Sequence, residues 1–237
     1  IYDWWHNKDS IFEPGYATDL ITQHSVDFIR ENRFHPFFLL VSYPAPHFPY
    51  QGPNDSAYRF PGVDFTTYGP VEDKRRAYRE MVETMDKGLG EIVEMLREES
   101  LTKNTIVVFL SDNGGNIPRA NNGPYFGEKG SLYEGGHRVP AAVYWKNQTA
   151  SFTSTETVMS FDITATLLAL AGATTSHPML DGIDLSPHIF EQQEIEKRTL
   201  FWRHDSTKAV RDGDWKLLID ITDTMLFNLA DDPGEQN

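Results

Sequence analysis

Two uninterrupted runs of apolar residues mark the first half of the chain. Residues 37–43 read Phe-Phe-Leu-Leu-Val-Ser-Tyr, and residues 105–110 read Thr-Ile-Val-Val-Phe-Leu. Runs of this length and composition are typical of strands buried on both faces of a parallel sheet. Prolines follow the first run and Ser111 follows the second, so each predicted strand ends sharply.

Helical periodicity fills the segment between these runs. Within residues 71–100, apolar side chains step by three and four while charges occupy the other face, as Tyr78, Val82, Met85, Leu89, Ile92 and Leu96 show. Gly88 and Gly90 weaken this helix slightly. A helix between two buried strands forms a βαβ unit, so we expect parallel strands whose carboxyl ends share one edge of the sheet.

Two further helices have recognisable ends. The first is predicted from Thr18, as its N-cap, to His35-Pro36, with Asp19 in its first turn. The second is predicted from Ser160, as its cap, to Gly172. Asp162 in the first turn of the second helix is interpreted as a partner of the helix dipole.

The last part of the chain changes to a strand-and-turn pattern. Residues 139–145 predict a third strand of the main sheet. Four short strand-like segments separated by turns such as Asp212-Gly213 then predict a small antiparallel subdomain, at residues 200–203, 208–211, 215–220 and 225–228.

Composition narrows the function classes. The 237 residues include 21 basic and 35 acidic side chains, a net charge of −14, which argues against a nucleic-acid binder that relies on phosphate contacts. Cysteine is absent, which excludes disulfides, thiolate zinc sites and cysteine nucleophiles. No run of 18 apolar residues indicates a membrane span.

Candidate chemistry gathers at the predicted strand ends. Asp112 and Asn113 offer hard oxygen ligands suited to Ca²⁺ or Mg²⁺. His47 lies in a proline-rich loop and Lys129 in a glycine-rich loop. A cation, a lysine and a histidine around one cavity suit a sulfate or phosphate ester.

Each of these residues also has an ordinary structural interpretation. Taken singly, Asp112-Asn113 is more commonly a plain turn, His47 a packed loop residue and Lys129 a solvated side chain. Glu134 and Arg138, which follow shortly afterwards, are interpreted as a structural ion pair rather than as catalytic residues.

In order and spacing, the chain resembles the sulfatase family of the alkaline phosphatase superfamily. The resemblance rests on the segments 36–43, 47–49, 111–115, 127–129, 133–140, 162–168, 181–182, 210–216 and 232–235. It implies an α/β fold with a mostly parallel sheet flanked by helices and a small C-terminal antiparallel sheet. Residues 1–198 would be the C-terminal part of the catalytic domain, and residues 199–237 the antiparallel subdomain.

The resemblance also implies roles for the candidate residues. Asp112 and Asn113 match two ligands of the family's calcium, with Mg²⁺ as an alternative, and Asp112 matches a residue that helps to activate the nucleophile. His47 matches the histidine near the sulfate and its leaving group, and Lys129 matches the lysine that grips the sulfate. The implied substrate is a sulfate ester, and a periplasmic, secreted or lysosomal-type compartment is suggested only by the family.

One departure from the family is informative. The family's nucleophile is a formylglycine made from a Cys/Ser-x-Pro-x-Arg motif, and no such motif occurs in these 237 residues. We expect the motif in a preceding part, and we expect this chain to need that part or self-association. Alone, it would not cleave aryl sulfates by the formylglycine route.

Two other functions stay open. One is a phosphodiesterase or phosphonate hydrolase of the same superfamily, which shares the metal chemistry. The other is a truncated, non-catalytic relative that binds an anion or a partner. We expect residues 50–70 and 114–137 to shape the choice of substrate.

Overall fold

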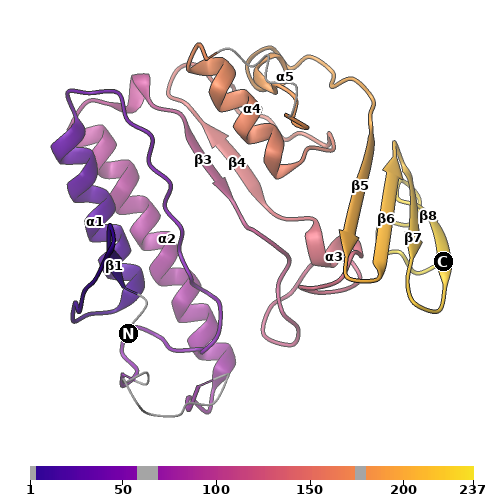
Figure 1. The fold of residues 1–237 in the computed structure, drawn as a ribbon, viewed down its shortest axis with the longest axis horizontal. Helices are drawn as coiled ribbons and strands as arrows, with labels where there is room; N and C mark the ends of the chain where they lie inside the picture. Colours follow the sequence, from indigo (N-terminus) through magenta and orange to yellow (C-terminus); the bar gives the residue numbers. More distant parts are fainter. Residues whose placement is uncertain (1–3, 58–68, 174–179) are drawn as a thin grey trace. The chain divides into compact units, whose positions relative to one another are not determined.

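A computed structural model describes residues 4–57, 69–173 and 180–237 (Figure 1). The contacts within the chain define two compact units. The first comprises residues 1–102 with 118–120, and the second comprises residues 103–117 with 121–237. The predicted division into a catalytic-domain part, residues 1–198, and an antiparallel subdomain, residues 199–237, differs from these units and stays a prediction. Part of the expected specificity loop, residues 58–68, lies outside the described residues.

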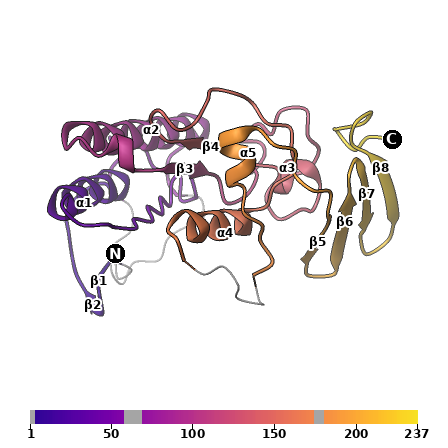
Figure 2. The ribbon, with the colours of Figure 1, turned by 90° about the horizontal axis from the view of Figure 1, so that it is seen from above.

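The first unit is built on two helices that lie side by side, as Figures 1 and 2 show from two directions. Helix α1 spans Ala17–Asn32 and helix α2 spans Lys74–Glu98. A short hairpin of β1 (Trp5–His6) and β2 (Asp9–Ser10) precedes them. Both predicted helices are confirmed.

The two helices approach closely at Gly88. A Cβ atom built there would lie 2.2 Å from Thr22 Oγ1 of α1 and 2.9 Å from the Tyr43 hydroxyl. These two hydroxyl groups are themselves hydrogen-bonded at 2.8 Å. Gly88 is therefore a packing residue, whereas a Cβ at Gly90 meets nothing within 4 Å.

The start of helix α1 corrects one prediction. The N-cap is Tyr16, not Thr18, and it makes no side-chain capping bond. Thr18 lies inside the helix and is buried, and its carbonyl accepts the hydroxyl of Thr22. Burial of Thr18 within the helix therefore overrides its capping preference.

Residues 37–43 form no assigned strand, although they were predicted as one. Their exposure alternates residue by residue, with Phe38 and Leu40 exposed and their neighbours partly buried, which is the period of an extended chain. This segment and residues 105–110 belong to different units, so their parallel pairing stays a prediction. Every strand pair among the described residues is antiparallel.

The second unit begins with a two-stranded ladder. Strand β3 (Val107–Leu110) follows a 3₁₀ turn at Thr102–Asn104 and pairs with β4 (Ala141–Tyr144). Both strands coincide with predicted ones. They are only partly buried here, and Leu110 and Tyr144 are exposed.

Helix α3 (Glu134–His137) is a single turn between the two strands. Helices α4 (Ser160–Leu170) and α5 (Ser186–Glu191) follow β4. The predicted helix α4 is confirmed, and Gly172 follows its end with a φ of +69°. Its N-cap is Met159 rather than Ser160.

Asp162 was interpreted as a partner of the helix dipole, but the structure shows that it also binds other segments of the chain. Its carboxylate is fully buried and pairs with both terminal nitrogens of Arg198. It also accepts the backbone N–H groups of Met159, at 2.7 Å, and Ile183, at 3.1 Å. Asp162 therefore joins the start of α4 to two later segments of the chain.

The chain ends in a four-stranded antiparallel meander, which confirms the predicted mixed α/β class with a small C-terminal sheet. Its strands are β5 (Thr199–His204), β6 (Thr207–Asp212), β7 (Trp215–Ile219) and β8 (Thr224–Asn228). Gly213, with a φ of +59°, lies in the predicted turn between β6 and β7. Within residues 4–57, 69–173 and 180–237, every helix is too short or too polar to cross a lipid bilayer.

Candidate active site

The Asp112-Asn113 pair lies directly after the carboxyl end of β3, as predicted. The Ser111 hydroxyl donates to the Asn113 carbonyl at 2.9 Å and shapes this turn. Asp112 is exposed and Asn113 is half-buried. Neither side chain has a polar partner in the described part of the chain, so their oxygens are available to a ligand.

The turn is held against helix α3 through glycines. Gly114 N–H donates to the Gly136 carbonyl at 2.9 Å. A Cβ atom at Gly114 would lie 1.9 Å from the Gly135 carbonyl oxygen, so only glycine fits this approach. Helix α3 thereby fixes the backbone that carries Asp112 and Asn113.

Lys129 lies in a loop that is hydrogen-bonded to the same turn. Its backbone N–H donates to the Gly115 carbonyl at 3.3 Å. Its amine is exposed and, among the residues described, makes no ion pair. The adjacent Glu128 carboxylate is occupied elsewhere, accepting the Ile117 N–H at 2.7 Å. The structure therefore brings the Lys129 loop next to the Asp112-Asn113 turn through the backbone.

His47 belongs to the first unit, where the loop that carries it packs on the start of α2. Ala45 and Tyr50 are buried with Ala77 and Met81 of that helix. The His47 ring is exposed, and its Nδ1 donates to the Phe48 carbonyl at 2.8 Å. This bond leaves Nε2 as the nitrogen that can exchange a proton with a substrate. That His47 shares a pocket with Asp112, Asn113 and Lys129 stays a prediction.

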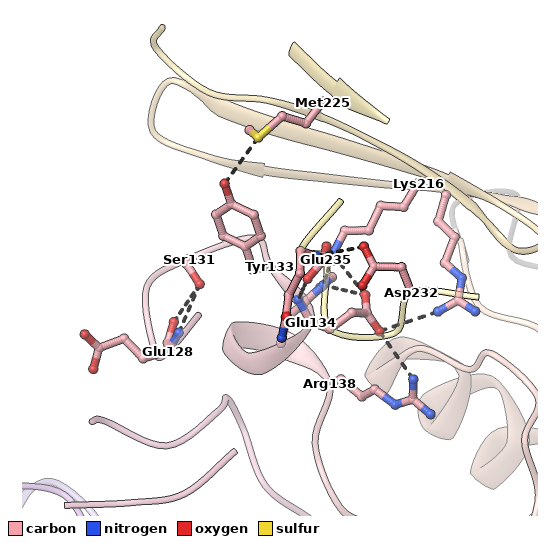
Figure 3. A network of polar contacts seen from close by, with 12 residues as sticks. Glu128, Ser131, Tyr133, Glu134, Arg138, Lys216, Met225, Asp232 and Glu235 are labelled. Atoms are coloured by element: carbon pink, nitrogen blue, oxygen red, sulfur yellow. Dashed lines mark hydrogen bonds and ion pairs between the residues drawn. The ribbon is translucent and has the colours of Figure 1, made fainter. Parts of the chain in front are cut away.

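A buried ionic network surrounds Glu134 at the start of helix α3 (Figure 3). Glu134 Oε1 lies 2.9 Å from Lys216 Nζ of β7, and Lys216 lies 2.8 Å from Glu235 Oε1. All three side chains are almost completely buried. The Glu235 carboxylate also accepts the backbone N–H of Glu134 at 2.5 Å, at the start of the helix.

Further basic side chains surround Glu134. Arg138 lies 3.6 Å and Arg211 3.7 Å from its Oε2, and the first of these contacts is the predicted structural ion pair. His137 Nε2 lies 3.3 Å from Oε1. Burial alone would raise the pKa of Glu134, but the contacts with His137 and Lys216 outweigh it and lower this pKa to about 2. Glu134 is therefore ionised at neutral pH.

Lys216, Glu235 and Arg211 lie in the segments 210–216 and 232–235 that carry the family resemblance, but no role was predicted for them from the sequence. The sequence did contain a signal that Lys216 is buried, because Leu218 lies two residues away on the same strand. Residues two apart on a strand share a face, and Leu218 belongs to the core with Ala209 and Phe227. A lysine on a core face must have a charged partner, and the remote Glu134 and Glu235 could not be identified without the fold.

The described residues supply only part of a metal site. No group of three or more His, Asp or Glu side chains that could hold a metal occurs in residues 4–57, 69–173 and 180–237. Ca²⁺ takes six to eight oxygen ligands. The unpaired oxygens of Asp112 and Asn113 are of the type that Ca²⁺ binds, and the described residues alone do not make up a full set of ligands.

Comparison with known proteins gives the context for this geometry. A model of the sulfatase family matches residues 1–173. Human N-acetylgalactosamine-6-sulfatase is 32% identical over 84% of this chain and 37% of its own length. Bovine arylsulfatase A is 28% identical over 93% of this chain and 46% of its own length.

Solved structures agree with the fold. The crystal structure of Ps i-CgsB has a TM-score of 0.82 at 32% identity and matches 98% of this chain and 52% of its own. A structure of Ps i-CgsB in complex with k-i-k-neocarrahexaose gives a TM-score of 0.83. The chain thus spans about half or less of the length of these relatives. Because the family match covers most of its residues, the chain belongs to the sulfatase family.

Proposed function

We propose that this chain carries the sulfate-gripping and part of the calcium-binding half of a sulfate ester hydrolase. The observation that carries the proposal is the hydrogen bond from the Lys129 N–H to the Gly115 carbonyl. It sets the loop with the exposed Lys129 amine beside the turn of Asp112 and Asn113, whose side chains have no polar partner among the described residues. Membership of the sulfatase family supports the reaction class. Relatives of this family generally use Ca²⁺ and a formylglycine.

The roles follow from the chemistry of each group. Asp112 and Asn113 would hold Ca²⁺, which would supply positive charge to the ester oxygens. The Lys129 ammonium would bind the sulfate, and it is available for this because no carboxylate of the described residues pairs with it. His47 Nε2 would give a proton to the departing oxygen while the Phe48 carbonyl holds Nδ1.

The 237 residues contain no formylglycine motif, and the described residues offer only two of the calcium ligands. We propose that the chain works with a further polypeptide segment, or with a second copy, that completes the site. Exposed apolar side chains on both units support this, with Phe38 73%, Leu40 75% and Tyr144 46% exposed. A monodisperse, thermally stable monomer of these 237 residues in light scattering would contradict this proposal.

Enzyme kinetics on the complete natural protein test the reaction class. We expect Ca²⁺-dependent cleavage of 4-nitrophenyl sulfate in preference to bis(4-nitrophenyl) phosphate. Lys129→Ala and His47→Ala should each lower kcat/KM by on the order of 100-fold. Lys103→Ala, at an exposed lysine next to β3, is the control and should leave kcat/KM unchanged.

Two results would redirect the proposal. Preference for the phosphodiester would assign the chain to the related phosphodiesterases or phosphonate hydrolases. Calcium binding without turnover of either ester would indicate a non-catalytic relative. One relative is named for a sugar sulfate, so N-acetylgalactosamine 6-sulfate is the first natural ester to test.

A further inference from the structure

Asn122 connects the two loops that carry the candidate site residues. Its Oδ1 accepts the Gly115 N–H at 2.8 Å, and its Nδ2 donates to the Gly115 carbonyl at 3.1 Å. The same Nδ2 donates to the Gly127 carbonyl at 3.0 Å. One side-chain amide thus bonds both backbone groups of one loop and a carbonyl of the other.

The positions of these bonds give Asn122 its importance. Gly115 lies two residues after Asn113, and Gly127 lies two residues before Lys129. The Gly115 carbonyl also accepts the Lys129 N–H. It is therefore bonded both to the Asn122 side chain and to the backbone of the Lys129 loop. Asn122 is half-buried, and it lies in a segment without helix or strand, where no regular ladder could hold the loops together.

We propose that Asn122 is a positioning residue that sets the distance between the Lys129 amine and the Asp112-Asn113 oxygens. A sulfate ester held by both would have to match that distance, because Lys129 would bind it directly while Asp112 and Asn113 would act on it through a bound cation. The effect of Asn122 on binding of the ester rests on the proposed function. The three hydrogen bonds of Asn122 do not depend on that function.

Only an amide can make this set of contacts. Two of the three bonds require an N–H donor and the third requires an acceptor. Asn122→Ala removes all three. Asn122→Asp keeps the size and the acceptor for the Gly115 N–H, but it turns a carboxylate toward the carbonyls of Gly115 and Gly127.

Asn121 provides a matched control. It is the preceding residue, is exposed, and its Oδ1 accepts only the Gly123 N–H at 2.8 Å. Asn121→Asp keeps that bond and places the same new charge one residue away. It therefore separates the loss of the clamp from a general repulsion of an anionic substrate.

Amide hydrogen exchange on the complete natural protein tests the clamp without reference to catalysis. In Asn122→Ala, exchange in residues 113–117 and 127–131 should be faster by on the order of tenfold. In Asn122→Asp, the Lys129 amide should exchange faster while the Gly115 amide stays protected. Unchanged exchange in both variants would overturn the inference.

Kinetics with 4-nitrophenyl sulfate then separate positioning from folding. Both Asn122 variants should raise KM by on the order of tenfold, with a smaller change in kcat. A variant that only lost folded protein would lower kcat at unchanged KM, and that result would contradict positioning. If the wild type cleaves no sulfate ester, the proposed function fails, while the exchange data still decide whether Asn122 is the clamp.

Discussion

Lys216 of the C-terminal sheet and Glu134 of helix α3 form a buried ion pair with 2.9 Å between Nζ and Oε1. Glu235, near the end of the chain, shares the same ammonium group at 2.8 Å. Because α3 also packs against Gly114, this network fixes the C-terminal sheet to the scaffold of the Asp112-Asn113 turn. The small C-terminal sheet is therefore part of the support of the candidate site.

Removing the Lys216 ammonium, which Glu134 and Glu235 share, should destabilise the fold. Lys216→Met would leave the carboxylates of Glu134 and Glu235 buried with less compensating charge. We expect the free energy of unfolding in urea to fall by about 3–5 kcal/mol. Lys208→Met, at an exposed lysine of the neighbouring strand β6, should change it by less than about 0.5 kcal/mol. Equal stability of the two variants would show that the network does not hold the sheet.

The lowered pKa of Glu134 predicts how stability depends on pH. Its pKa falls from 4.5 to about 2 on folding, so the carboxylate stabilises the fold above about pH 4.5. This stabilisation is lost as the pH falls toward 2. The full shift corresponds to roughly 3 kcal/mol.

Glu134→Gln isolates this contribution. The variant should be less stable than the wild type at pH 7, and the difference should shrink by roughly 2 kcal/mol between pH 7 and pH 3. Glu31→Gln, on the exposed surface of α1, is the control. Urea denaturation at both pH values measures the difference, and a deficit independent of pH would refute the assigned role of Glu134.

The two glycines of helix α2 should respond oppositely to alanine. Gly90→Ala fills open space and should stabilise the protein by about 0.5–1 kcal/mol. Gly88→Ala places a methyl group against Thr22 and Tyr43 and should destabilise it by about 1–3 kcal/mol. Thermal unfolding of both variants tests this, and stabilisation by Gly88→Ala would mean that α1 and α2 are farther apart.

The elements with a clear hydrophobic period were predictable from the sequence. Helix α2 and strands β5 to β8 were found within a few residues of their predicted positions. In these segments local preference and burial agree. Asp112 and Asn113 were placed correctly at a strand end because the apolar run of β3 stops abruptly before them.

Details that depend on remote partners were not predictable. Thr18 and Ser160 are good capping residues by preference, yet the N-caps of the two helices are Tyr16 and Met159. A capping bond contributes only about 1 kcal/mol, so burial and packing decide the position. The partner of Asp162 is 36 residues away at Arg198, and no local pattern indicates it.

In the proposed site, Asp112 and Lys129 act on one sulfate ester. A double-mutant cycle of Asp112→Ala and Lys129→Ala, measured as kcat/KM for 4-nitrophenyl sulfate with saturating Ca²⁺, tests it most directly. Groups that hold the same ester should show a coupling energy of about 0.5–3 kcal/mol. Strictly additive losses would place the two side chains at separate sites and contradict the account.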